Sequence, residues 1–228
     1  MNLGNLMTMA RLETPGAKKN AVGDTALKLI LNSGAVDVAS YSVCLPEDTK
    51  FAAVADQGEY NLSSVVSRFL VTSGEGLWYR DSATDNYKRL TPHTIKWLDK
   101  NRPYWRDEDA GVPVYYYQHG NNLGLVPAPD GAVTEGLWLY FGQKPQAMSS
   151  TSHYPFGYGS EITRLAPLSE CILAYAKWKL SKALNKAATV ILAEEQVYNK
   201  SLVGKTALIS RRLDISGDRN TKYAGKII

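Results

Sequence analysis

Apolar positions recur at helical spacing near both ends of the chain. From Asp24, a candidate N-cap, they fall on one face of a helix that ends near Pro46. The positions on this face are Leu27, Ile30, Leu31, Gly34, Val38, Tyr41 and Leu45. A second stretch, from about Pro167 to Asn199, has no internal Gly or Pro and predicts one long amphipathic helix. Residues 1–22 lack a clear period and predict a short helix or arm followed by a loop.

The middle of the chain has a different pattern, which favours antiparallel strands. Between Pro46 and about Asp81 it contains short runs rich in Val, Phe, Trp and Tyr that are separated by glycines. These runs are KFAAVADQ, EYNLSS, VVSRFLVTS and GLWYRD. The following segment, TPHTIKWLDKNRPYW, predicts a brief helix because Pro92 stands near its start.

Residues 111–148 predict three more strands. Apolar and aromatic residues alternate from Val112 to Tyr117, and Gly120 to Asn122 favour a tight reversal, so the first two strands should form a hairpin. The turn residues at 127–131, PAPDG, come next. The aromatic run at 137–141, LWLYF, then predicts a third strand that is buried on both faces.

Together these patterns predict an α+β fold. An antiparallel helix pair or bundle is built from the two chain ends, and an antiparallel β-sandwich or barrel-like domain is inserted between them. Gly34 lowers helix propensity by about 1 kcal/mol relative to Ala, but it lets another backbone come close, so we expect tight packing there. The predicted boundaries are 1–47 and 160–203 for the helical domain, 48–159 for the β-domain and 204–228 for a C-terminal arm.

The composition is that of an ordinary globular protein. Of the 228 residues, 44% are hydrophobic and 21% are charged. No run approaches the roughly 18 apolar residues of a membrane-spanning helix, and the N-terminus lacks the apolar core of a signal peptide, so we expect a protein made in a cytoplasm without a membrane partner. Cys44 and Cys171 each stand alone, which favours two inert thiols over a disulfide or a zinc site.

Positive charge is concentrated at the C-terminal end. Residues 204–228 hold six basic residues against Asp214 and Asp218, so this stretch carries about +4, equal to the formal net charge of the whole chain. The rest of the chain is therefore close to neutral. A basic arm of this kind fits either nucleic acid or the acidic surface of a partner protein, and composition alone does not choose between them.

Patterns that would indicate catalysis or metal binding are weak. His93, His119 and His153 lie far apart, without the paired spacing of a metal site. Residues 204–206, Gly-Lys-Thr, resemble the end of a phosphate-binding loop, but Asn199 stands where its first glycine belongs and the segment follows a helix. We therefore expect no catalytic residues, no cofactor and no metal.

Several motifs also follow one another in a distinctive order and spacing. They are the helix ending in Leu31 and Asn32, EYNL at 59–62, KRLTPHTIKWLDKNRPYWRD at 88–107, VPVYYYQ at 112–118, LGLVPAPDGA at 123–132 and LWLYFGQKPQAM at 137–148. With the long helix after Glu161 they cover about four-fifths of the chain. This order resembles the head-to-tail adaptor proteins of tailed double-stranded DNA phages, a group that includes the tail tubular protein A type. The chain departs from that family at Ser63, where members usually have Pro after Tyr-x-Leu.

The resemblance implies a structural virion protein of the head-tail junction, with no catalysis and no cofactor. Members form a homo-oligomeric ring, dodecameric in the family, between the portal protein and the tail nozzle or tail tube. Double-stranded DNA would pass through the ring without specific binding, because tight phosphate contacts would hold DNA that must move.

We expect two sets of contact residues. The small-residue helix face and the nearby lysines are candidates for contacts between identical subunits: Gly34, Tyr41, Ala176, Lys179, Ala183 and Lys186. We expect the C-terminal arm to be loose in a monomer and to dock on the portal or on a neighbouring subunit. Its candidate docking residues are Lys205, Arg211, Arg212, Arg219, Lys222 and Tyr223.

Alternatives from three other classes stay open. A carbohydrate-binding or receptor-binding β-domain of a virion would stack sugars on Tyr115 to Tyr117 and Trp138, although alternation at strand spacing favours sheet core and interface. A nucleic-acid-binding protein would use the basic arm, but its body should then be basic as well. An enzyme needs a nucleophile, a metal set or a phosphate loop, and none survives inspection of the sequence.

Overall fold

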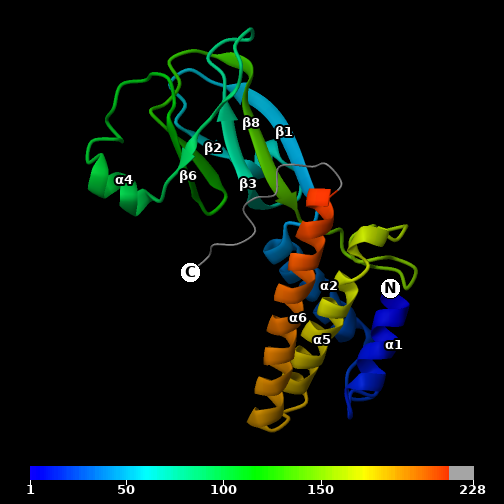
Figure 1. The fold of residues 1–228 in the computed structure, drawn as a ribbon. Helices are drawn as coiled ribbons and strands as arrows, with labels where there is room; N and C mark the ends of the chain where they lie inside the picture. The colour runs from blue at the N-terminus through cyan, green and yellow to red at the C-terminus, as the bar shows by residue number, and fades with distance from the viewer. Residues whose placement is uncertain (216–228) are drawn as a thin grey trace. The chain divides into compact units, whose positions relative to one another are not determined.

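The computed structural model describes the backbone of residues 1–215 and the side chains of residues 1–207. The chain divides into two compact units. The helical unit contains Met1–Leu45 and the chain from Lys144 onward, and the β-unit contains Pro46–Gln143. The fold is mixed α+β, with helices at both ends and strands in the middle, as the sequence predicted (Figure 1).

The helical unit is built from four long helices and one short 3₁₀ turn, η1. They are α1 (Leu3–Glu13), α2 (Asp24–Ser42), η1 (Thr163–Leu165), α5 (Leu168–Ala183) and α6 (Ala188–Ile215). Helix α2 begins at Asp24 with Gly23 as its N-cap, one residue before the predicted cap, and Asp24 instead accepts a hydrogen bond from Arg11 of α1 at 2.8 Å. Figure 1 shows α2, α5 and α6 running side by side, and their packing forms the core of this unit.

The long C-terminal helix expected from about Pro167 to Asn199 is in fact two helices. Residues 184–187 interrupt it, and Asn185 takes a left-handed conformation with φ 50°. The backbone N–H of Leu184 still bonds to the carbonyl of Leu180, whereas Asn185 bonds back to Lys182, so the helix tightens and stops. Asn tolerates this conformation better than most residues other than Gly. The chain then reverses, and α6 packs back along α5 as a helical hairpin.

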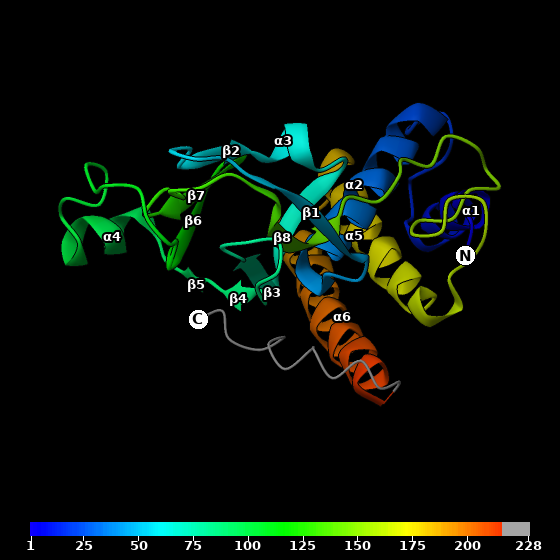
Figure 2. The ribbon, with the colours of Figure 1, turned by 90° about the horizontal axis from the view of Figure 1, so that it is seen from above.

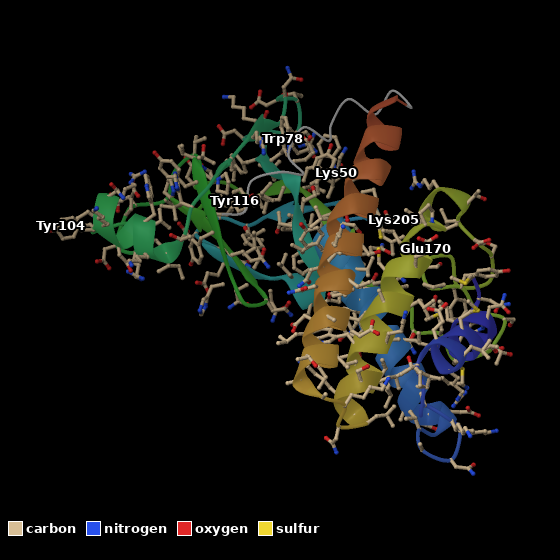
Figure 3. The ribbon with its side chains drawn as sticks, turned by 60° about the horizontal axis from the view of Figure 1, so that its bottom comes forward. Lys50, Trp78, Tyr104, Tyr116, Glu170 and Lys205 are labelled. Atoms are coloured by element: carbon tan, nitrogen blue, oxygen red, sulfur yellow. The ribbon has the colours of Figure 1, made fainter. Side chains whose placement is uncertain are left out.

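The predicted C-terminal arm, residues 204–228, overlaps with helix α6. Helix α6 continues through Ile215, so residues 204–215 are helical and not loose. Thr206 is buried, and Lys205 forms a 2.7 Å ion pair with Glu170 of α5. Figure 3 shows these two side chains on neighbouring helices. The first half of the predicted arm therefore belongs to the helical unit.

The segment from Lys144 to residue 159, predicted to close the β-domain, is part of the helical unit. The side chain of Asn32 in α2 accepts a hydrogen bond from the Met148 N–H at 2.8 Å and donates to the Met148 carbonyl at 3.2 Å. The N–H groups of Leu3 and Gly4 bond to carbonyls of this segment at 2.8 and 2.9 Å. These bonds satisfy helix-start donors that would otherwise lack partners, and they attach the segment to α1 and α2.

The β-unit holds two four-stranded sheets. The first has the order β1-β8-β3-β4 and the second β2-β7-β6-β5 (Figure 2). The strands are β1 (Pro46–Ala53), β2 (Glu59–Asn61), β3 (Phe69–Tyr79), β4 (Lys88–Arg89), β5 (Thr91–Pro92), β6 (Tyr115–His119), β7 (Asn122–Val126) and β8 (Val133–Gln143). Two short helices join them, α3 (Leu62–Val65) and α4 (Ile95–Asn101). All described pairs are antiparallel except β5 with β6, which is parallel.

The apolar core of the β-unit lies between the two sheets. Buried residues of both sheets form one cluster, with Leu77, Leu137 and Leu139 from the first sheet and Leu123 and Leu125 from the second. The described strands stay in two sheets and do not close into a barrel, so the sandwich form of the prediction holds and the barrel-like form does not.

The hairpin of β6 and β7 forms as predicted, whereas β8 belongs to the other sheet, where it pairs with β1 and β3 on either side. One prediction about individual strands needs correction. The two runs expected on either side of Gly74 form one strand, β3, whose register with β8 shifts between Thr72 and Leu77. Gly76 sits in this irregular stretch with φ 68°, a conformation that glycine adopts easily.

Among the described residues, no helix has the length and apolar character needed to cross a bilayer.

Gly34 lies in the contact between α2 and α5, and the structure explains its small size. A Cβ atom built on Gly34 would lie 2.9 Å from a ring carbon of Tyr175 and 3.4 Å from a methyl carbon of Ile172. We predict that Gly34→Ala lowers the free energy of unfolding by about 1–3 kcal/mol, because the added methyl group overpacks this contact. Chemical denaturation followed by helical circular dichroism measures the change.

Gly204 in α6 provides a matched control, since a Cβ built there meets none of the described atoms within 4 Å. Gly204→Ala should raise the free energy of unfolding by about 1 kcal/mol through helix propensity alone. Equal stabilisation by both substitutions would contradict the packing role of Gly34.

Candidate assembly surfaces

An aromatic cluster joins three helices of the helical unit. Tyr175 and Trp178 of α5 pack on Tyr198 of α6, with ring centroids 5.3 and 5.9 Å from that of Tyr198. The hydroxyl of Tyr198 donates a hydrogen bond to the carboxylate of Asp37 in α2. The buried side chain of Tyr198 in α6 thus contacts both α5 and α2, and it fixes α6 against these two helices.

The lysines expected at a subunit contact lie partly on this cluster. The ammonium group of Lys179 is 3.8 Å from the centroid of the Trp178 ring, and that of Lys182 is 4.4 Å from it. Lys179 is only half exposed. Cation–π contacts of this kind hold a cation over an aromatic face, so the structure gives Lys179 a contact inside its own subunit.

The other predicted oligomer residues divide into buried and exposed ones. Gly34 and Ala176 are buried inside the helical unit, so the small-residue face serves packing within one chain and is closed to a neighbour. Tyr41 is 53% exposed and Ala183 is exposed, while Lys186 is half exposed in the turn after α5. Only these last three remain available on the surface.

The predicted docking residues of the arm are spread over three environments. Lys205 is held by Glu170, whose hydrogen bond and negative charge raise the pKa of the lysine. Arg211 and Arg212 lie in the last turns of α6. Arg219, Lys222 and Tyr223 lie outside the described residues.

Helix α6 carries exposed apolar residues that the sequence interpretation missed. Val190, Leu192, Val197 and Val203 are each at least 40% exposed. Val190 and Val197 are seven residues apart, so they lie nearly above one another on the helix, and we call this pair the α6 apolar face. Leu192 and Val203 lie on nearly the opposite side of the helix. The sequence contains this seven-residue spacing. The prediction of one continuous helix from about Pro167 to Asn199 considered only the residues of its apolar, buried face.

A second candidate surface lies along α2. An open groove of about 430 Å³ is lined by α2 on one side and by residues 144–147 on the other, and we call it the α2 groove. Leu29 and Val36 give it apolar area, and Leu29 is exposed, but Asp37 and other polar side chains line it as well. The helical unit therefore carries two different candidate contact surfaces, one on α6 and one beside α2.

The outer face of the first sheet carries an ordered row of aromatic and basic residues. Lys50, Trp138, Trp78 and Arg89 occupy paired positions across the four strands. The Trp138 indole N–H donates to Asp48 at 2.7 Å, and the ammonium group of Lys50 lies 4.8 Å from the Trp138 ring centroid. Figure 3 shows Lys50 and Trp78 on this unit. The Trp138 ring is thus engaged by side chains of the same face, which disfavours its use as a sugar-stacking platform.

A further exposed aromatic residue follows α4. Tyr104 is 79% exposed and points away from the strands in Figure 3. Nearby, the rings of His93 and Trp97 stack with centroids 3.5 Å apart. His93 is thus part of an aromatic packing contact.

The described residues show few features of a metal-binding or catalytic site. No group of three His, Cys, Asp or Glu side chains among them is arranged to hold a metal ion. Cys44 and Cys171 are free and buried, and burial raises the pKa of Cys44 to about 11, which keeps the thiol protonated and unreactive near neutral pH. Residues 204–206 lie inside α6, so they cannot form a phosphate-binding loop.

The described part of the chain thus consists of two packed units, and the helical unit has exposed apolar residues. The chain belongs to the family described as SU10 adaptor protein, which it matches over residues 1–221. It is therefore a phage adaptor-type protein, a class of virion component that binds other components at the head-tail junction, and this family implies a structural and non-enzymatic role. The search of curated proteins found no match.

Buried tyrosines predict how stability responds to alkaline pH. Burial is the largest cause that raises the pKa of Tyr198, and the hydrogen bond to Asp37 adds to it. Burial likewise raises the pKa of Tyr175 in the same unit. An unfolded tyrosine ionises near pH 10, so the stability contributed by the neutral folded form is complete below about pH 10 and is lost as the pH rises above it.

We predict that the free energy of unfolding of the helical unit falls above about pH 10, by up to about 1.4 kcal/mol per pH unit for each such tyrosine. Tyr198→Phe should make this decline shallower, whereas Tyr104→Phe, which removes the same hydroxyl from an exposed ring, should leave it unchanged. Denaturation curves at several pH values measure both. Identical slopes for the wild type and Tyr198→Phe would contradict the assignment.

Proposed function

We propose that the chain is a structural virion protein whose copies form a ring between the portal protein and the tail. The ring is dodecameric, as the family resemblance implies, and double-stranded DNA passes through it without specific binding. Its function is to connect the head to the tail nozzle or tail tube. The family match over nearly the whole chain is the observation that carries this proposal.

The surfaces of the helical unit support assembly into a ring. A ring needs heterologous contacts, in which one surface of a subunit meets a different surface of the next. The α6 apolar face and the α2 groove are two such surfaces on one unit. Neighbouring apolar side chains that are exposed on a soluble protein often mark a site of protein–protein contact. The α6 apolar face then meets the α2 groove of the next copy, with Tyr41, Ala183 and Lys186 near the contact.

The basic C-terminal region contributes to attachment in this proposal. Its helical part carries Lys205, Arg211 and Arg212, and its last part carries Arg219, Lys222 and Tyr223. Ordering of this region at a contact with the portal or with a neighbouring subunit would place positive charge where a partner supplies acidic groups.

Negative-stain imaging of the purified protein, alone and mixed with portal rings, tests the function directly. We expect twelvefold rings, either free or only on the portal. A chain that stays monomeric and does not bind the portal would overturn the proposal, and binding screens with glycans and single-stranded DNA would then test the two remaining binding functions.

A substitution on α6 tests the surface that forms the ring. We predict that Val197→Glu prevents ring formation because it places a charge in an apolar contact. The monomer should keep its stability within about 0.5 kcal/mol, because Val197 is 53% exposed. Imaging and light scattering measure assembly, and denaturation measures stability.

Leu12→Glu is the matched control, since Leu12 lies in α1 and is 73% exposed. It introduces the same charge on another face and should leave the rings intact. Rings formed normally by Val197→Glu would show that the α6 apolar face is not the contact.

A further inference from the structure

β1 forms one edge of the first sheet. Within the described residues it pairs with β8 along one side, and its other side has no strand beside it. Every residue from Pro46 to Ala52 is exposed or half exposed, so the rest of the β-unit leaves this edge open. Alternate residues of an edge strand direct their N–H and C=O groups away from the sheet. At eight residues, β1 is long enough to hold an added strand by main-chain hydrogen bonds.

The two faces of this edge differ in chemistry. On the outer face, Asp48 accepts the hydrogen bond of Trp138 and Lys50 lies over the same ring. On the inner face, Phe51 packs against Tyr60 with centroids 5.7 Å apart, beside the buried Ala53. A strand added here must therefore be polar on one face and apolar on the other.

The C-terminal end of the sequence has this pattern. Residues 220–228 read NTKYAGKII, in which Lys222 and Lys226 alternate with Tyr223 and Ile227 at spacings that fit two opposite faces of a strand. These nine residues are enough to pair with all eight residues of β1. Gly217 follows the end of α6 and is a helix stop signal. These residues lie outside the described part of the chain, so the argument here rests on their sequence.

We propose that residues 220–228 of one copy add as a strand to the free edge of β1 in a second copy. Tyr223 and Ile227 then extend the apolar inner face beside Phe51, and Lys222 and Lys226 lie on the outer face near Asp48. Asp48, on the same outer face, carries a negative charge that complements the two lysines. A shift of one residue would exchange the two faces, so the pattern also sets the register.

This inference rests on the assembly of several copies proposed above and names one contact between them. It also gives the basic C-terminal residues a partner inside the ring. The contact would cross-link neighbouring subunits through main-chain hydrogen bonds, which add to the side-chain contacts of the helical unit.

A labelled peptide of residues 216–228 tests the contact with a chain that ends at Ile215. We expect fluorescence anisotropy to show saturable binding, and hydrogen exchange with the peptide bound to slow at β1 but not at β4, the opposite edge of the same sheet. The same peptide with Ala224→Pro should bind at least about tenfold more weakly, because proline removes a ladder hydrogen bond and is poorly tolerated inside a strand.

Substitutions in the protein test the contribution of charge to peptide binding separately from that of the main-chain hydrogen bonds. Asp48→Asn, which keeps an acceptor for the Trp138 indole N–H, should weaken peptide binding about threefold or more at low salt, whereas Asp85→Asn, an equal charge change in an exposed loop, should not. Equal binding of the proline peptide, or slowed exchange at β4 instead of β1, would overturn the proposal. So would a full-length monomer whose β1 is already protected at nanomolar concentration, since the segment would then pair within its own chain.

Imaging the full-length protein in the same experiment separates this contact from the proposed function. Rings without peptide protection of β1 would reject the strand contact and leave the adaptor function standing. Peptide protection of β1 without rings, with or without the portal, would support the strand contact and reject the ring.

Discussion

The pairing of β1 with β8 is the constraint on which the two-unit fold depends. Pro46 pairs with Gly142, at the first and nearly the last residue of the β-unit. An inserted unit whose ends are close together can be added to another fold without separating the elements on either side of it. The helical unit can thus stop at Leu45 and resume at Lys144, although its parts are far apart in sequence.

Within each unit, buried tyrosines join elements by two kinds of contact at once. The Tyr117 hydroxyl of β6 donates to Glu59 of β2 at 2.6 Å, and the Tyr198 hydroxyl of α6 donates to Asp37 of α2. Each ring is buried in an apolar cluster while its hydroxyl reaches a carboxylate near the surface. Because a buried hydroxyl without a partner costs free energy, the carboxylate also sets where each ring can lie. The abundance of tyrosine thus reflects packing in both units.

The sequence predicted elements whose signals are local. Helix α2 has a regular apolar period and a proline after its end, and the β6–β7 hairpin has Gly120 and Asn121 in its turn. Elements decided by distant partners were harder to predict. The run at 137–141 predicted a strand, but its local pattern did not show that this strand, β8, pairs with β1, about 90 residues away. The break at Asn185 has neither Gly nor Pro, so only the packing of α6 on α5 reveals it.

Candidate contact residues were harder to predict for the same reason. Gly34 and Ala176 correctly indicated close helix packing, but periodicity cannot tell a partner helix in the same chain from one in another subunit. Lys179 was placed at a contact by its charge, whereas its position over Trp178 depends on the rotamer and packing of α5. The α6 apolar face became visible only when the structure showed which side of the helix Tyr198 and Leu202 bury.

The edges of the two sheets differ in a way that bears on assembly. β2, β4 and β5 are edge strands of two or three residues, too short to act as templates for another chain. β1 is an edge strand of eight residues that keeps Glu47, Asp48 and Lys50 exposed. Charges on an edge discourage non-specific pairing and leave it open to a strand of complementary charge. β1 is therefore the one long edge strand of the β-unit, and its charges favour a partner strand of complementary charge.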